Sequence, residues 1–445
     1  MKYIFSVLTI LLFFFSFSQE IALDSVQGTE QKLNEVIVSS IRVKYTSPFT
    51  HSNVSKEELS KRNLGQDLPI LLNYLPSVVT TSDAGAGIGY TGIRIRGISA
   101  QSTNITINGI PFNDAESHGT YWVNLPDFSS SVESLQVQRG VGTSTNGSGA
   151  FGSSINILTD GISEDPYAEI SNSFGSYDSR KHTVKFSSGL LNDSFEISGR
   201  LSKIDSDGYV DRAFSDLKSY FLQGAYKRGN TFLKALAFGG HEKTYQAWDG
   251  LSKEQIKENR RQNPLTYENE IDNYKQDHYQ MHLNQKIDSK WSTNIGLNYT
   301  YGRGYFEQFR EDDDISTYAG IVVSDLDASG NALGTSDLIR RRWLDNNFYV
   351  LNTTLNYVSS KLNMNFSSYY SSYSGDHFGE VIWARQIGVN NSIRDEYYRG
   401  NGKKTEWSLF AKSSYLINDA LEIFGDLQFG QLSYKTTGLT SDLVN

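Results

Sequence analysis

From about Pro166 onward, the sequence alternates apolar and polar residues with a period of two. Tyr299 and Tyr301, for example, alternate with Asn298 and Thr300. This period is typical of β-strands that present one apolar face. The pattern predicts about eleven strands, several of ten or more residues, and therefore an extended antiparallel sheet in the second part of the chain.

The connections between these strands alternate between short and long. Short turns are predicted near Gly189–Asn192, Arg228–Gly229, Asp288–Ser289, Ser359–Ser360 and Asn418–Asp419, with one early exception at Gly175–Ser176. Longer polar loops are predicted at about 203–217, 241–275, 303–341 and 374–402. Outer-membrane barrels have this asymmetry. A soluble β-sandwich is the alternative, but it gives no reason for long loops to fall always at one end.

Composition agrees with a barrel that crosses a membrane with strands. Aromatic residues reach 13%, while only 38% of the residues are hydrophobic, which excludes a bundle of membrane helices. The chain has no cysteine, so disulfide scaffolds, thiol enzymes and Cys-ligated metal sites are excluded. A net charge of −9 argues against nucleic-acid binding.

The first residues predict export. Lys2 precedes an almost wholly apolar run from Tyr3 to Phe17, and small serines precede Gln19. This pattern indicates a signal peptide over residues 1–18, because the run is short of the roughly 20 residues that a membrane helix needs. An uncleaved anchor is the alternative.

Residues 19–50 are polar and predict a flexible segment, whereas residues 51–160 predict a small α+β domain. Ser55 and Glu58 form a capping-box pattern at the start of a helix, and a second helix is predicted over Asp67–Tyr74. Short strands are predicted at 93–96, 105–107 and 135–139. The Asn108–Gly109 pair predicts a hairpin turn.

Residues 161–445 are predicted to form the barrel part. Bacterial single-chain barrels close with an even number of strands, and the last residues do not resemble a closing strand. We therefore expect the sequence to be the N-terminal part of a longer protein.

The α+β segment resembles the plug domain of TonB-dependent outer-membrane transporters, in the version found in Bacteroidetes-like bacteria. The motifs that carry the resemblance follow one another in the family's order and spacing: Ile95–Ile98, Ile107–Asp114, Tyr121–Trp122, Ser131–Glu133, Arg139–Gly140, Gly149–Gly152 and Ile155–Ile157. The later stretch Ser206–Tyr209 resembles the start of the family's barrel.

The resemblance implies a plug folded inside a barrel of about 22 strands, of which this chain would supply half. It also implies a monomeric importer of scarce ligands, mostly ferric siderophores but also haem, cobalamin or glycans. TonB of the TonB–ExbB–ExbD complex would pull on a TonB box, which by position matches Glu35, Val36, Ile37, Val38 and Ser39. Such a segment could add as a strand to its partner's sheet. An ordinary apolar patch or first plug strand is the alternative.

The short segment before the plug departs from one branch of the family. Only some thirty residues separate the signal peptide from the plug, too few for an extra β-sandwich or a signalling domain. This weakens the case for a glycan importer that carries such an extension, and for transcriptional signalling.

Two sets of site residues follow from the resemblance. Contacts between plug and barrel are expected from Arg94, Arg96, Glu133 and Arg139, although these charges could instead be solvated on a strand face. Ligand contacts are expected from the glycine-rich loop 82–90, the loop 113–122 and the long barrel loops. The candidates are Tyr90, Asn113, Asp114, Glu116, His118, Tyr121, Trp122, Tyr245, Trp248, Trp383 and Arg385. Packing of Tyr121 and Trp122 against the wall is an equal alternative.

No catalytic or metal site is predicted. His278 and His282 have helical ligand spacing, but four residues of a strand span about 13 Å, too far to share one ion. The acidic run 311–314 reads as a solvated loop. P-loop, dinucleotide and nucleophile-elbow motifs are lacking. We therefore expect no enzyme and no resident cofactor, and either an energy-coupled importer or a passive or adhesive surface barrel.

Overall fold

A computed structural model describes residues 42–43, 49–144, 147, 151–418 and 420–441. All of them belong to a single structural unit of the chain. The predicted signal peptide and the predicted TonB box, Glu35–Ser39, lie outside the described residues.

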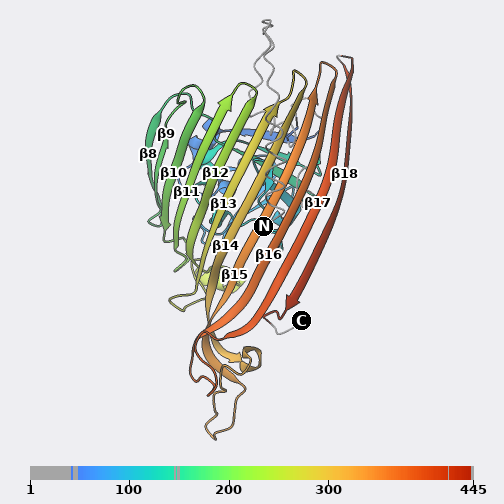
Figure 1. Cartoon of the computed structure of the whole chain (residues 1–445). Coiled ribbons are helices and arrows are strands. Elements are labelled where there is room, and N and C mark those ends of the chain that lie inside the picture. Colours follow the sequence, from blue (N-terminus) through green and yellow to red (C-terminus); the bar gives the residue numbers. More distant parts are fainter. Residues whose placement is uncertain (1–41, 44–48, 145–146, 148–150, 419, 442–445) are drawn as a thin grey trace. The chain divides into compact units, whose positions relative to one another are not determined.

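The second part of the described chain forms one antiparallel sheet of eleven strands. Each strand pairs with its neighbours in the sequence, and Figure 1 shows the strands side by side in chain order. The strands are β8 (Tyr167–Phe174), β9 (Arg180–Ser187), β10 (Phe195–Ser206), β11 (Ser215–Arg228), β12 (Thr231–Tyr245), β13 (Ile271–Lys286), β14 (Trp291–Asp314), β15 (Thr335–Val358), β16 (Leu362–Ala384), β17 (Glu396–Asn418) and β18 (Leu421–Gly438). The predicted barrel-type sheet is confirmed.

The strands are longer and the loops shorter than the sequence predicted. β14 and β15 have 24 residues each, so the connection between them covers only 315–334 instead of about 303–341. The connection between β16 and β17 likewise covers 385–395. The ends of these strands carry polar residues on both faces, so the alternation that predicts a strand is lost there.

The plug elements precede this sheet. A five-stranded sheet has the order β1-β6-β7-β4-β5, with β4 and β7 parallel, and β2 pairs with β3 in a second, small sheet. In chain order the plug elements are β1 (His51–Ser55), α3 (Lys56–Arg62), α4 (Leu68–Leu71), β2 (Val78–Ser82), β3 (Thr91–Ile95), η2 (Ala100–Ser102), β4 (Thr103–Ile107), β5 (Ile110–Pro111), η3 (Trp122–Asn124), η4 (Phe128–Ser131), β6 (Val132–Arg139) and β7 (Ser153–Thr159).

Local signals predicted several plug elements. The Ser55 side chain caps α3 by accepting a hydrogen bond from the Glu58 amide at 3.2 Å. Asn108 and Gly109 have φ angles of 54° and 81°, as a two-residue hairpin turn between β4 and β5 requires. The second predicted helix is shorter than expected, because only α4 forms within Asp67–Tyr74.

One apolar core joins the plug to the sheet. It contains most buried apolar residues of the plug and also Phe221 of β11 and Leu236 and Phe238 of β12. The inner face of these two strands is therefore apolar where the plug packs on it, although the inner face of a membrane barrel is generally polar. Burial of these side chains is the main favourable term for holding the plug in place.

Candidate ligand-binding site

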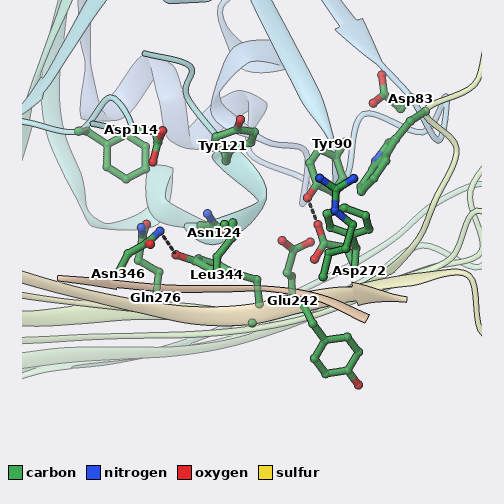
Figure 2. A pocket seen from close by; sticks show the side chains of 17 residues that line it. Asp83, Tyr90, Asp114, Tyr121, Asn124, Glu242, Asp272, Gln276, Leu344 and Asn346 are labelled. Carbon is green, nitrogen blue, oxygen red and sulfur yellow. Dashed lines mark hydrogen bonds between the residues drawn. The ribbon is translucent and has the colours of Figure 1, made fainter. Parts of the chain in front are cut away.

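A cavity of about 430 Å³ lies between plug loops and the inner side of β12 to β15. Figure 2 shows side chains from both walls pointing toward one another. The lining residues are Asp83, Tyr90, Phe112, Asp114, Tyr121, Asn124, Glu242, Trp248, Asp272, Tyr274, Gln276, Gly304, Tyr305, Phe306, Arg342, Leu344 and Asn346.

The plug wall of the cavity begins with the glycine-rich loop 83–90. Gly85 and Gly89 have φ angles of 75° and 93°, which residues with a Cβ rarely adopt. A Cβ on Gly89 would also lie only 2.7 Å from Ser215 Oγ of β11. Glycine thus lets the loop run directly against the strands, and it places Tyr90 at the cavity.

Aromatic rings form one side of the cavity. Tyr90 and Trp248 make an edge-to-face contact with ring centres 5.4 Å apart, and Trp248 contacts Phe306 in the same way at 5.7 Å. The guanidinium of Arg342 lies 5.3 Å from the Phe306 ring centre. Such rings offer a bound ligand a large apolar contact area and a stacking surface.

The strand wall carries two neighbouring carboxylates, Glu242 of β12 and Asp272 of β13. Glu242 is opposite Tyr274 and Asp272 is opposite Thr244, so the two acids are diagonal neighbours on one face. The Tyr90 hydroxyl donates to Asp272, and the Thr244 hydroxyl donates to Glu242 at 3.1 Å. Figure 2 shows both carboxylates beside the Tyr90 hydroxyl.

The predicted ligand loop 113–122 divides into residues that face the cavity and residues that do not. Asp114 and the half-exposed Tyr121 line the cavity. Trp122 is buried in the plug core, which matches the packing alternative rather than a ligand contact. The Asn113 side chain is used within the loop, where it donates to the carbonyls of Thr103 and His118 and accepts from the Ile105 amide.

Glu116 and His118 connect this loop to the strands instead of lining the cavity. Glu116 accepts hydrogen bonds from the Tyr373 hydroxyl at 2.7 Å, His377 Nε2 at 2.6 Å and the Tyr434 hydroxyl at 2.7 Å. Burial opposes its charge, but these bonds lower the pKa of Glu116 below its ordinary value. Burial and the neighbouring Lys404 lower the pKa of His118.

The four candidates from the barrel loops have different positions. Trp248 lines the cavity. Tyr245 is buried at the end of β12 and donates to the Tyr267 carbonyl at 2.7 Å. Arg385 pairs with Asp337, and Trp383 is half-exposed near the end of β16. Tyr245, Arg385 and Trp383 are not among the described residues that line the cavity.

Ion pairs attach the plug to the first strands of the sheet. Asp127 of the plug lies 2.8 Å from Lys181 Nζ and 3.2 Å from Arg200 Nη1, and all three side chains are buried. Burial alone would raise the pKa of Asp127, but Arg200 and Lys181 lower it well below its ordinary value. Asp160 pairs with Lys185 at 2.6 Å. The sequence did not predict the contacts of these two aspartates, because their basic partners lie on strands that are distant from them in the sequence.

The four residues predicted to contact the barrel make other contacts. Arg139 Nε donates to the Pro76 carbonyl at 2.9 Å, and Arg96 lies 3.5 Å from the Arg139 carbonyl. Glu133 pairs weakly with a plug lysine at 3.4 Å, and Arg94 is exposed. Within the described ranges, none of these four residues forms a salt bridge with the eleven-stranded sheet. Ion pairs between plug and sheet come from Asp127 and Asp160 instead.

Most cavity residues on the strands were not predicted. Glu242, Asp272 and Tyr274 fall inside the segment 241–275, which was predicted as a long loop, and Gln276 directly follows it. This prediction hid their position on an inner face. Strand alternation would have found them if the strand ends had been placed correctly.

Two kinds of feature are lacking in the described residues. No helix there is long and apolar enough to cross a membrane. Likewise, that part of the chain contains no group of three or more His, Asp or Glu side chains placed to hold a metal ion. His278 and His282 lie in the strand β13, as predicted.

Residues 43–174 match the family model of the TonB-dependent receptor plug domain. The chain is 32% identical over 158 residues to the vitamin B12 transporter BtuB of Vibrio vulnificus. The matched segment covers 36% of this chain and 25% of that protein. It is 26% identical over 175 residues to the ferric enterobactin receptor of Pseudomonas aeruginosa, covering 36% and 24%. The matches therefore span about a quarter of these relatives.

The fold resembles the crystal structure of the ferric citrate transporter FecA in its unliganded form. The TM-score is 0.66 at 14% sequence identity, over 88% of this chain and 57% of that one.

An α+β plug packed on the inner face of an antiparallel sheet defines the class of plugged outer-membrane barrels. The plug-domain match and the relatives show that this chain is similar to TonB-dependent receptors over part of their length. The relatives and structural neighbours are described as transporters and receptors, not as enzymes.

Proposed function

We propose that the protein is an outer-membrane receptor that imports an iron chelate by energy-coupled movement of its plug. The observation that supports this most is the cavity formed jointly by plug loops and strands. A ligand bound there contacts the part that has to move, so binding and gating are physically linked. The similarity to a ferric enterobactin receptor and to a ferric citrate transporter structure favours iron chelates.

Plug movement needs an external source of energy. The plug shares an apolar core with β11 and β12, and buried ion pairs of Asp127 attach it to β9 and β10. Breaking a buried ion pair costs about 3–5 kcal/mol, which thermal motion alone rarely supplies. TonB, acting with ExbB and ExbD, would provide this energy by binding Glu35–Ser39 as an added strand. We further propose that the receptor acts as a monomer and is exported by its signal peptide.

Cobalamin is the second candidate ligand, because the chain is 32% identical to a vitamin B12 transporter over the matched part. A glycan importer or a passive or adhesive barrel has less support. A passive pore has no use for a plug that occupies the inner face of its wall.

Growth and uptake distinguish these candidates. A strain that lacks the gene should fail to grow on ferric chelates as sole iron source, and the full-length gene should restore growth. Uptake of labelled cobalamin with normal growth on iron would favour the second candidate. Equal growth and equal ligand binding with and without the gene would contradict both.

The Val36→Pro variant tests the energy coupling separately. Proline removes a backbone N–H that strand addition requires. The variant should still bind the chelate, but it should not import it or pull down the periplasmic domain of TonB. Unchanged uptake would contradict the proposed role of Glu35–Ser39.

A further inference from the structure

The charge of the cavity wall is strongly unbalanced. Four carboxylates line the cavity, and Arg342 is its one basic residue among those described; the acids are Asp83, Asp114, Glu242 and Asp272. In the described part of the chain, none of these four acids forms a salt bridge with a basic side chain. The cavity is therefore lined by more acidic than basic groups.

Arg342 does not provide this compensation, because its guanidinium is engaged elsewhere. Its Nη2 donates to Ser441 Oγ at 2.8 Å, and its Nε lies 3.4 Å from the Tyr398 hydroxyl. The guanidinium also lies over the Phe306 ring. Glu242 receives a hydrogen bond from the Thr244 hydroxyl, and Asp272 receives one from the Tyr90 hydroxyl.

Amide oxygens add further unused acceptors. Asn124 lines the cavity and is only 7% exposed, and its buried Oδ1 atom has no hydrogen-bond partner among the described residues. Asn346 Oδ1, from the strand wall, is also without a partner. A buried acceptor without a donor is costly, and a bound ligand that brings N–H groups removes this cost.

We propose that this cavity selects an iron chelate that carries a positively charged amine, and that the amine binds beside Glu242 and Asp272. This inference rests on the proposed import of an iron chelate and adds the chemical class of that chelate. A cation is attracted by the carboxylates and donates hydrogen bonds to them. The aromatic wall contacts the apolar part of the ligand. A polyanionic chelate, such as a ferric tris-catecholate, is repelled by the same carboxylates.

A pair of matched ligands tests this charge preference on the full-length receptor in outer membranes. One is a linear ferric trihydroxamate with a free primary amine, and the other is its N-acetylated derivative, which has the same iron centre without the charge. With radioactive iron as label, the amine form should bind about tenfold more tightly, which corresponds to about 1.4 kcal/mol. A labelled ferric tris-catecholate should bind more weakly than both.

Variants locate the amine. Glu242→Gln keeps the shape of the side chain and removes its charge, so the tenfold preference for the amine form over the acetylated form should disappear. Asp272→Asn should act in the same direction. Glu133→Gln is the matched control, because this exposed plug carboxylate is not among the cavity residues. Unchanged binding of the acetylated form also shows that a variant is correctly folded.

The outcomes separate this inference from the proposed function. Equal binding of the amine and acetylated forms by the wild type, or tighter binding of the tris-catecholate, would overturn the inference and leave iron-chelate import intact. A tenfold preference that persists in both variants would also overturn it. If no ferric chelate of any charge binds, the proposed function fails, and the inference fails with it.

Discussion

The plug loop 113–121 is attached to the strands mainly through Glu116, so removal of this side chain should release the loop. Glu116 accepts three hydrogen bonds of 2.6–2.7 Å, from Tyr373, His377 and Tyr434. In Glu116→Ala all three are lost, whereas the hydrogen bond from Lys404 Nζ to the Ala115 carbonyl at 2.8 Å remains.

The expected effect follows from the charge of the acceptor. A hydrogen bond to a charged group contributes about 1.5–3 kcal/mol, and three bonds to one carboxylate are not additive. The Glu116 side chain is 16% exposed, so water replaces part of the lost interaction. We therefore expect the loop to open more easily by about 3 kcal/mol, which is roughly a hundredfold in the opening equilibrium.

Hydrogen exchange followed by mass spectrometry measures this equilibrium directly. Amides of the loop should exchange roughly a hundredfold faster in Glu116→Ala, whereas amides of the plug core should be unchanged. Glu133→Ala is the control, since that exposed carboxylate makes only a 3.4 Å ion pair within the plug. Equal protection of the loop in wild type and Glu116→Ala would show that the three hydrogen bonds do not hold it.

Three further substitutions test other contacts. Gly402→Ala places a Cβ where the Glu116 carboxylate lies, so it should increase loop exchange in the same peptides. Asp127→Asn leaves buried Lys181 and Arg200 without their counter-charge, and plug unfolding by urea should become easier by about 3–5 kcal/mol. Burial raises the pKa of Asp67 to about 8, above its ordinary 3.8, so the plug should lose stability as pH rises from about 4 to 8. Asp67→Asn should abolish this pH dependence in the same urea titration.

The sequence predicted the local elements well where one short signal decides the structure. The Asn108–Gly109 turn needs two positive φ angles, and few residue pairs other than this one allow them. The serine cap at the start of α3 is equally local. The eleven strands followed from alternation along the central part of each strand, where one face is apolar.

The site was predicted only in part, because its geometry depends on contacts between distant segments. Tyr90 and Trp248 were predicted and meet at the cavity, although 158 positions separate them in the sequence. Glu242 and Asp272 were missed, since nothing local shows that two acids thirty positions apart are diagonal neighbours. Asn113 was predicted from its place in the loop 113–122, but this place does not show that backbone groups occupy its side-chain amide.

The central claim is that the segment before residue 160 packs on the inner face of the strands. Val123 of the plug and Leu217 of β11 are buried in one apolar cluster, whereas Leu222 of the same strand is 46% exposed on the opposite face. These 445 residues contain no cysteine, so within them a pair of introduced cysteines can react only with each other.

The most direct measurement compares two cysteine pairs in the full-length receptor, with a protease site inserted in the 161–166 connection. A short thiol cross-linker should join the fragments after cleavage in the Val123→Cys, Leu217→Cys pair but not in the Val123→Cys, Leu222→Cys pair. Fragments that separate in both pairs, or stay joined equally in both, would contradict a plug folded against the inner face of the sheet.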